Sequence, residues 1–402
     1  MIAALLQQIP PAGVDATPAP ISDLATPNVP WSYLLPLLIL ALGALVGLAA
    51  VAFVRKAFPR FVGAGYTVVV ATAALVSTVP LWNRVGNAKE GAISAVSGAV
   101  GIDRFSLFIT GVICVSVILA ALLADGYLRR EGLEGPDLYL LMLMSAAGGV
   151  IMVSANDLIV LFIGLEVLSI SAYVMAAMHS RRLSSQEAGL KYFVLGGFGS
   201  AILLYGIAMV YGATGSTSLL HAQEFLSGHL LEKDGLLLAG LGLMLVGFGF
   251  KVAAAPFHMW AADVYQGAPS PVSAFMSSAV KVAAFGGMVR VFVVAFDSYR
   301  DQWAPIVFVL AVLSLLVGSV LAVVQTNVKR MLAYSSINHA GFILIGVEAA
   351  GEGLPWGRLR GSRETEPGAV GKPPPMRATK TSPVPTMRVS VTTSWRNFAS
   401  RL

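Results

Sequence analysis

Charged residues are scarce in this chain, and cysteine is almost absent from it. Only 12% of its 402 residues are Asp, Glu, Lys or Arg, whereas a soluble globular protein carries roughly 25%. Hydrophobic residues make up 56% of the chain. Most of the chain must therefore lie in lipid or pack against other apolar side chains, which excludes an ordinary soluble enzyme.

The lack of cysteine and of nucleotide-binding motifs excludes several kinds of site. Cys114 is the only cysteine, so neither an intramolecular disulfide nor a cysteine-ligated zinc or iron–sulfur site can form. The sequence also has no phosphate-binding loop, no dinucleotide-binding glycine motif and no spacing typical of metal ligands. We therefore expect this chain to bind no metal and no redox cofactor of its own.

The net charge of +6 does not indicate a nucleic-acid-binding protein, because it is concentrated at one end. Residues 354–402 contain nine of the 27 Lys and Arg residues and only two of the 21 acidic residues. The rest of the chain is left with 18 basic and 19 acidic residues. We therefore expect no nucleic-acid partner.

Long apolar runs occupy most of the chain between residues 33 and 348. A helix that crosses a bilayer needs about 20 apolar residues, because each residue adds about 1.5 Å and the hydrocarbon core is about 30 Å thick. The sequence thus predicts an all-α, polytopic membrane bundle of about ten transmembrane helices. The predicted spans are 33–54, 61–82, 104–125, 137–154, 157–178, 190–212, 236–257, 272–296, 304–325 and 331–348.

The distribution of basic residues predicts the orientation of these helices. Lys and Arg are concentrated after the first, third, fifth and ninth spans, at 55–60, 129–130, 181–182 and 329–330. Such loops face the cytoplasm, so we expect the N-terminus and the loop at 297–301 to be external.

The basic, proline-rich tail after residue 348 does not fit this rule. Two interpretations are open. The tail is either a disordered extension or a segment foreign to the fold, as when a reading frame is lost and a chain ends early. We favour the second, because the tail contradicts the predicted topology.

Three ionisable residues fall inside predicted spans. Glu166 lies about ten residues into the fifth span, Lys251 in the second half of the seventh, and Lys281 near the middle of the eighth. Burying each charge in lipid costs at least about 2.5–3.5 kcal/mol. A structural Glu–Lys pair is one explanation, but it leaves the third charge unexplained. We favour proton transfer, because burial disfavours the charged form of a group whereas a nearby opposite charge favours it.

A helix break is predicted next to Lys251. Pro256 lacks a backbone N–H and clashes with the preceding turn, and Gly247 and Gly249 precede the lysine. Broken helices in the middle of a membrane are typical of ion sites in transporters, where freed backbone groups face a cavity. A proline kink without function is the alternative.

Two histidines and a further lysine complete the candidate set. His258 follows the proline at the cytoplasmic end of the seventh span, and His339 lies deeper, among Ser and Asn residues of the tenth span. Histidine can pass a proton through either ring nitrogen near neutral pH, although a hydrogen bond to a neighbouring carbonyl is the structural alternative for His258. Lys191, near the start of the sixth span, either takes part in proton transfer or only marks the cytoplasmic interface.

Four stretches of the chain resemble a known family. They are FIGLEVLSISAYV, EAGLKYFVLGGFGSAILLYGIAMVYGATGSTSL, FKVAAAPFHMWAADVYQGAPSPVSAFM and VKRMLAYSSINHAGFILIG. They are similar to the antiporter-like, proton-conducting subunits of respiratory complex I, the bacterial proton-pumping NADH–quinone oxidoreductase. Within that family, DVYQGAPSPVSAF and KYFVLGGFGSAILLYG resemble subunit N more than subunits L and M. The resemblance covers about residues 33–348.

The resemblance implies an antiporter-like fold and roles for the candidate residues. In that family a glutamate in span five, a lysine on a broken span seven and a lysine in span eight carry protons, which implies this role for Glu166, Lys251 and Lys281. The family has fourteen spans around two inverted five-helix repeats, so we expect this chain to be truncated after span ten, with an incomplete second repeat. The implied segments are an external N-terminal segment (1–30), three N-terminal spans (31–136), the first proton-channel repeat (137–296), the start of the second repeat (304–348) and a disordered basic tail (349–402).

The resemblance also implies partners and a location. It predicts a multi-pass protein of the cell inner (plasma) membrane that helps to translocate protons, coupled to electron transfer from NADH to quinone. The implied partners are other membrane subunits of complex I and the lipid bilayer, while NADH, FMN, iron–sulfur clusters and quinone would be bound by partner subunits. Two alternatives are a subunit of a multisubunit sodium/proton antiporter and a non-conducting scaffold subunit.

Overall fold

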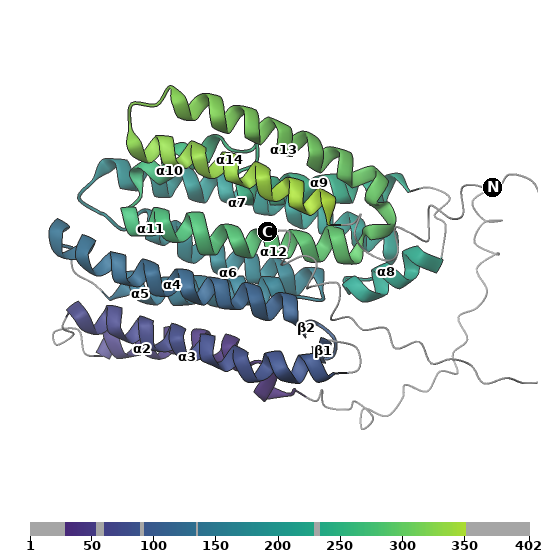
Figure 1. Cartoon of the computed structure of the whole chain (residues 1–402), viewed down its shortest axis with the longest axis horizontal. Coiled ribbons are helices and arrows are strands. Elements are labelled where there is room, and N and C mark those ends of the chain that lie inside the picture. The colour runs from purple at the N-terminus through teal and green to yellow at the C-terminus, as the bar shows by residue number, and fades with distance from the viewer. Residues whose placement is uncertain (1–28, 54–59, 89–91, 134–135, 229–233, 351–402) are drawn as a thin grey trace, which may run out of the picture. The chain divides into compact units, whose positions relative to one another are not determined.

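The computed structural model describes residues 29–53, 60–88, 92–133, 136–228 and 234–350. Nearly all of the predicted external segment (1–30) and basic tail (349–402) lies outside the described residues. In the described part, long helices run alongside one another, with α2 and α3 on one side of the bundle and α13 and α14 on the other (Figure 1).

The helices follow the predicted spans closely, with short additional elements between them. The first half of the chain contains the 3-10 turn η2 (Trp31–Tyr33), α2 (Leu35–Phe53), α3 (Arg60–Asn87), β1 (Ala92–Ala95), β2 (Val100–Asp103), α4 (Arg104–Glu131), α5 (Asp137–Ser154), α6 (Leu158–Ala176) and α7 (Leu183–Thr214). The second half contains α8 (Leu219–Gly228), α9 (Gly235–Val252), α10 (Met259–Gly267), α11 (Ser270–Phe275), η3 (Met276–Val280), α12 (Lys281–Val289), η4 (Arg290–Ala295), η5 (Asp297–Tyr299), α13 (Arg300–Val323) and α14 (Val328–Ala349).

Nine segments of the described chain are long and apolar enough to cross a membrane. They correspond to the first nine predicted spans. The tenth corresponds to α14, a helix of 22 residues that packs along α13. It is less apolar because its middle carries the polar sequence Ser335, Ser336, Asn338 and His339. The chain is thus a multi-pass membrane protein.

Polar caps determine where several of these helices begin and end. The Asp103 side chain accepts a hydrogen bond from the backbone at the start of α4, and Asp157 and Asn327 do the same for α6 and α14. At the other ends, Gly132 and Gly215 adopt left-handed φ angles of 63° and 72° after α4 and α7. These residues satisfy backbone groups that a helix end leaves without partners, or allow the chain to turn.

Close glycine contacts bring the helices around the candidate residues together. A Cβ atom at Gly206 of α7 would lie 2.8 Å from the carbonyl oxygen of Gly240 on α9. Likewise, a Cβ atom at Gly164 of α6 would lie 2.9 Å from the carbonyl oxygen of Gly148 on α5. The glycine-rich start of α9 is therefore a face of small residues for close helix packing, as in other membrane bundles.

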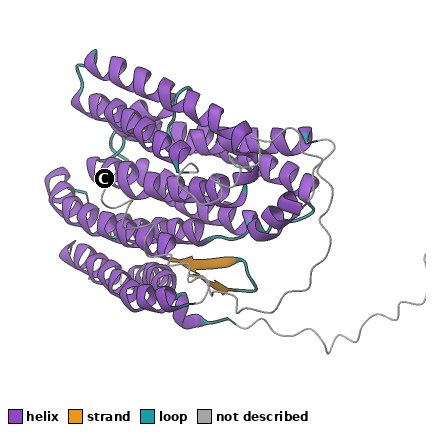
Figure 2. Ribbon diagram, turned by 45° about the vertical axis from the view of Figure 1, so that its right-hand side comes forward, coloured by secondary structure: helices purple, strands orange, loops and turns teal. Residues whose placement is uncertain are grey.

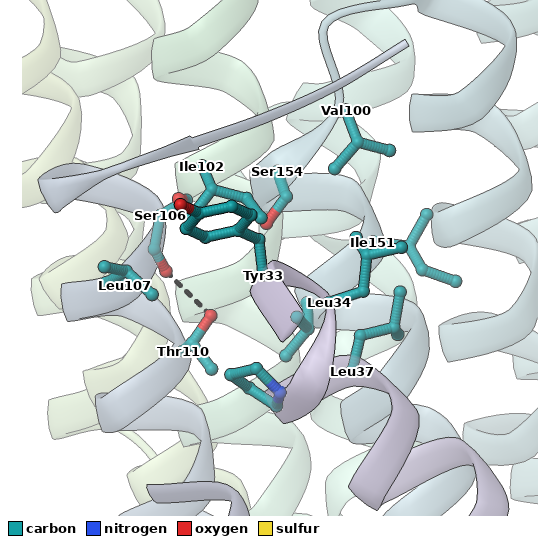
Figure 3. Close-up of a pocket in the computed structure, with 12 residues that line it drawn as sticks. Tyr33, Leu34, Leu37, Val100, Ile102, Ser106, Leu107, Thr110, Ile151 and Ser154 are labelled. Carbon is teal, nitrogen blue, oxygen red and sulfur yellow. Dashed lines mark hydrogen bonds between the residues drawn. The ribbon is translucent and has the colours of Figure 1, made fainter. Parts of the chain in front are cut away.

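A two-stranded hairpin is the one departure from an all-α chain in the described ranges. Strands β1 and β2 pair antiparallel, with Ala92 opposite Asp103, and lie at one end of the bundle (Figure 2). Below the hairpin is a cavity of about 30 Å³ that apolar side chains such as Tyr33, Leu34 and Ile102 line (Figure 3). A cavity of this size holds about one water molecule, so it is no site for a substrate.

Arg290 connects the helices at the same end as the hairpin. Its Nη2 atom donates to Asp103 at 2.7 Å, its Nη1 atom to Asn156 at 3.0 Å and its Nε atom to the Val153 carbonyl at 2.7 Å. This arginine lies inside the predicted eighth span but was not among the sequence candidates. Since its guanidinium is buried and fully engaged, it joins β2 and the α5–α6 connection to η4.

Candidate proton-transfer site

The seventh span is broken directly after Lys251. Helix α9 ends at Val252, Ala253 adopts a left-handed φ of 57°, and the chain resumes as α10 at Met259, with Pro256 in the break. Side chains satisfy backbone groups that the break frees. Ala255 N–H donates to Ser314 Oγ at 2.9 Å, and Trp260 Nε1 donates to the Phe250 carbonyl at 3.0 Å. The bundle itself therefore stabilises the break, as membrane proteins require of irregular backbone.

Lys251 is buried at the end of α9. The residue is only 5% exposed, and its ammonium donates to Ser169 Oγ of α6 at 2.6 Å. The same nitrogen lies 5.5 Å from the ring centroids of both Tyr173 and Tyr192. Aromatic faces at this distance stabilise a cation, so a hydroxyl and two rings surround this charge.

The aromatic side chains around Lys251 also hold three helices together. Tyr192 of α7 stacks on Trp260 of α10, with centroids 4.6 Å apart, and meets Tyr173 of α6 edge to face at the same distance. The rings therefore hold α6, α7 and α10 together around Lys251.

Glu166 lies on the same face of α6 as Ser169, three residues earlier. The glutamate is half-buried, and its Oε1 atom is buried without a hydrogen-bond partner among the described residues. Its charge is close enough to Lys251 for an electrostatic interaction. No direct Glu166–Lys251 ion pair within 4 Å forms in the described part of the chain, so the hydrogen bond that Lys251 makes to α6 goes to Ser169.

Lys281 is the second buried ammonium, and its contacts lead to a different helix. It is 5% exposed and donates to both the hydroxyl and the carbonyl oxygen of Ser336 on α14, at 2.8 and 2.9 Å. Its nitrogen lies 5.9 Å from the ring centroid of Tyr265 on α10. Lys281 thus links the eighth span to α14.

The helix around Lys281 is interrupted by wider turns. The π-helical segments η3 and η4 come directly before and after α12, which begins at Lys281. π-Turns in α-helices are frequent at functional sites. The sequence analysis predicted one continuous span here, because a π-turn has no simple sequence signal.

The other candidates lie outside the two lysine sites. His258 is half-buried next to the break. His339 was expected to lie deep in the bundle, but its side chain is exposed on α14, with its ring centroid 6.4 Å from that of Phe342. The tertiary contacts explain this difference: Ile337, Ala340 and Leu344 form the buried face of α14, and this face does not include residue 339.

Lys191 belongs to a charged network that joins α7, α10 and α14. Its ammonium contacts Glu187 at 2.7 Å and Asp263 of α10 at 2.9 Å. The second oxygen of Asp263 accepts from Arg330 of α14 at 2.6 Å, and Arg330 also donates to Gln266 at 2.9 Å. Asp263 was not among the predicted residues, although it is the only charged residue between 252 and 280.

The two buried lysines share one chemical property. Within the described residues, neither ammonium lies within 4 Å of a carboxylate, and both donate to a serine hydroxyl. An ammonium with neutral partners can lose its proton without leaving a buried carboxylate unpaired. The arrangement is therefore suited to proton exchange, and the described ranges contain no group of His, Cys, Asp and Glu residues that could hold a metal ion.

Comparisons with known proteins agree with this geometry. Residues 155–354 match the family described as NADH:quinone oxidoreductase/Mrp antiporter, transmembrane. NADH-quinone oxidoreductase subunit N of Myxococcus xanthus is 45% identical over 317 residues, which are 79% of this chain and 60% of that protein. Subunit N of Mycobacterium tuberculosis H37Rv is 38% identical over an alignment of 367 residues, in a match that covers 81% of this chain and 68% of that protein.

Solved structures show the same fold. A chain of respiratory complex I from Thermus thermophilus is 32% identical, with a TM-score of 0.64 over 79% of this chain and 65% of that chain. A chain of the Mrp complex from Dietzia is 20% identical and has a TM-score of 0.67 over 80% of this chain and 59% of that chain, a similarity of fold alone.

This chain spans about 60–68% of the length of the curated relatives described here. The match with the mycobacterial relative covers more than two thirds of that protein, and the family match at residues 155–354 includes the broken seventh span and the helices that carry the buried lysines. The chain therefore belongs to the family of NADH-quinone oxidoreductase subunit N.

Proposed function

We propose that this chain is a proton-conducting membrane subunit of an NADH-quinone oxidoreductase in the cell inner (plasma) membrane. The observation that carries the proposal is the pair of buried ammonium groups, Lys251 and Lys281, whose partners are hydroxyls and aromatic rings rather than carboxylates. Intramembrane ionisable residues are expensive to bury and typically belong to ion pathways.

In this proposal, Glu166 and Lys251 act as a coupled pair. Ser169 follows Glu166 by three residues on α6 and accepts a hydrogen bond from the lysine. When Glu166 is ionised, its charge favours the ammonium form of Lys251, and protonation of Glu166 removes that support. A change at either group therefore alters the proton affinity of the other. The pair can pass on a proton when the surroundings of one member change.

Lys281 is the second station of the proposed path. Its contacts with Ser336 extend from the segment 137–296, proposed as the first five-helix repeat, to the segment 304–348, proposed as the start of a second. His258 and Lys191 lie toward the predicted cytoplasmic side of these lysines, where they are candidates for proton uptake. His339 is assigned a secondary role, because its side chain lies on the exposed face of α14.

NADH, FMN, the iron–sulfur clusters and quinone belong to partner subunits in this proposal. The energy for proton movement would come from electron transfer in those subunits and reach this chain through other membrane subunits. The chain's own residues contribute binding, positioning and exchange of protons.

Co-purification and pumping test the proposal. A gene-deleted host strain is complemented with a tagged copy of the chain or with its Lys251→Ala variant. We expect the tagged chain to co-purify with NADH-oxidising subunits, and we expect inverted membrane vesicles to show NADH-driven acidification that the variant loses. Isolation without those subunits, with sodium-dependent antiport in vesicles, would instead identify a sodium/proton antiporter subunit. Co-purification with full pumping by the variant would identify a scaffold.

A further inference from the structure

Each buried lysine has a serine hydroxyl partner on another helix. Lys251 donates to Ser169 across 82 residues of sequence, at 2.6 Å, and Lys281 donates to Ser336 across 55 residues, at 2.8 Å. The two contacts involve four different helices: the first joins α9 to α6, and the second joins α12 to α14. Local packing alone does not explain why both buried lysines have a serine hydroxyl as their hydrogen-bond partner.

A hydroxyl is the smallest side-chain group that both accepts and donates a hydrogen bond. Ser169 accepts from Lys251 and at the same time donates to the carbonyl oxygen of Leu165, one turn earlier. If Lys251 loses its proton, rotation about the Cβ–Oγ bond lets the same hydroxyl donate to the neutral amine. A carboxylate in this place would instead hold the ammonium in its charged form.

We propose that Ser169 and Ser336 are proton-transfer residues, each forming the hydroxyl link between a buried lysine and the next group along the path. This inference rests on the proposed function. In the step at Lys281, an Nζ–H bond breaks and a bond to Ser336 Oγ forms, while the proton that Ser336 already carried passes to a water molecule. The ammonium becomes a neutral amine, and the serine is a neutral hydroxyl before and after the step.

The step at Lys251 is the counterpart in the first repeat. A water molecule protonated by Glu166 gives its proton to Ser169 Oγ, and the proton of that hydroxyl passes to the neutral amine of Lys251. Glu166 becomes a carboxylate and Lys251 an ammonium, so charge and atoms balance. The geometry supports this order because Glu166 and Ser169 share one face of α6, and only Ser169 is in hydrogen-bond contact with the lysine.

Of the two serines, Ser336 is the one whose contact with a lysine joins the two proposed repeats. Its contact with Lys281 connects α12 to α14, and the next polar residue on α14, Asn338, accepts from Ser319 of α13 at 3.3 Å. Ser336 therefore brings the contact of Lys281 onto the helix proposed as the start of the second repeat.

Matched serine variants test this inference in the assembled complex. Ser336→Ala is compared with Ser335→Ala, which removes a hydroxyl from the neighbouring residue on α14. Ser169→Ala is compared with Ser145→Ala, which removes a buried hydroxyl that donates to the Leu168 carbonyl at 3.0 Å. Ser→Thr variants at 169 and 336 keep the hydroxyl, and Ser→Gly variants are second hydroxyl-free substitutions for use if alanine prevents assembly. Lys281→Ala tests the proposed function itself.

The measured quantity is the rate of NADH-driven acidification of inverted vesicles per assembled complex, followed as a function of pH. We expect the hydroxyl-free variants at 169 and 336 to lose at least about ten-fold, because a positioned proton donor or acceptor typically contributes about 10²–10⁴-fold. The threonine variants should retain at least about half of the rate, and Ser335→Ala and Ser145→Ala should match the unmodified chain.

The outcomes separate the two proposals. If the hydroxyl-free variants at 169 and 336 pump at the unmodified rate while Lys281→Ala does not, the serine inference is wrong and the proposed function stands. An equal loss in the alanine and threonine variants also overturns the inference, because it indicates a packing role. If Lys281→Ala pumps at the unmodified rate, the proposed function is wrong, and the inference with it.

Discussion

The lysines in the middle of the bundle and the charged residues at its end have opposite kinds of partner. Lys251 and Lys281 are buried and donate to serine hydroxyls. Asp263, in contrast, contacts two cations, Lys191 and Arg330, at 2.9 and 2.6 Å. An opposite charge at this distance holds a group in its ionised form, whereas a hydroxyl can serve the charged and the neutral form alike.

This difference separates two tasks in one membrane protein. The Asp263 network joins α7, α10 and α14 and so holds the half-helix that follows the break. In the proposed function, the lysine sites leave their ammonium groups free to exchange protons. The comparison therefore predicts large effects on transport for changes in the middle, and effects mainly on stability for changes at the end.

Replacing Lys251 by arginine should have the largest effect on proton transport. Arginine keeps the positive charge but cannot be deprotonated at accessible pH. We expect Lys251→Arg to lower NADH-driven acidification of inverted vesicles at least about ten-fold per assembled complex. The matched control is Lys329→Arg, because Lys329 donates to a backbone carbonyl, that of Ala268, at 2.6 Å. Normal pumping by Lys251→Arg would show that this lysine acts only through its charge.

Glu166 should be the next most sensitive position. Glu166→Gln keeps the shape of the side chain but cannot give up a proton, so we expect proton transfer to fall while the complex still assembles. Glu166→Asp keeps the carboxyl group on a shorter side chain and should retain part of the activity. Vesicle acidification and native gels measure the two properties separately. Equal rates for the glutamine variant and the unmodified chain would remove Glu166 from the path.

Asp263→Asn should affect stability more than transport. Both ion pairs are partly exposed, and such pairs contribute roughly 0.2–1 kcal/mol each, so we expect a lower Tm of the solubilised complex and a change in pumping below about two-fold. Asp263→Glu should recover most of the loss. Asp125→Asn is the control, because Asp125 pairs with Arg129 within a single helix. A ten-fold loss of pumping with unchanged Tm would instead place Asp263 in the proton path.

The smallest expected effect on activity belongs to a test of topology, which asks which loops face each side of the membrane. On a Cys114→Ser background, a cysteine at 298 should react with a membrane-impermeant reagent added outside the cell, and a cysteine at 181 should not. Pumping should be unchanged in both variants. This assigns the end that carries the Asp263 network to the cytoplasm and the hairpin end to the outside. Labelling at 181 but not at 298 would reverse the assignment.

The sequence predicted three ionisable groups within the spans, but not the buried Arg290 or the residues that contact the two lysines. Glu166, Lys251 and Lys281 were recognisable because a charge within an apolar run is rare. Ser169 and Ser336 carried no such signal, because serine is tolerated throughout membrane helices and its partner lies 55 or more residues away. Two residues that were not predicted are nevertheless recognisable in the sequence. Asp263 is a lone charged residue after the helix break, and Arg290 is a charged residue within a predicted span.

The sequence by itself determined that this chain is a membrane bundle, where its spans lie and which buried charges it carries. Length and apolarity suffice for this, because the bilayer imposes a minimum span and a high cost on buried charge. Only the tertiary structure decided which hydroxyl each lysine meets, that His339 is exposed, and that π-turns flank Lys281. These features depend on how far one helix is rotated and shifted against another, and contacts between residues distant in the chain set that geometry.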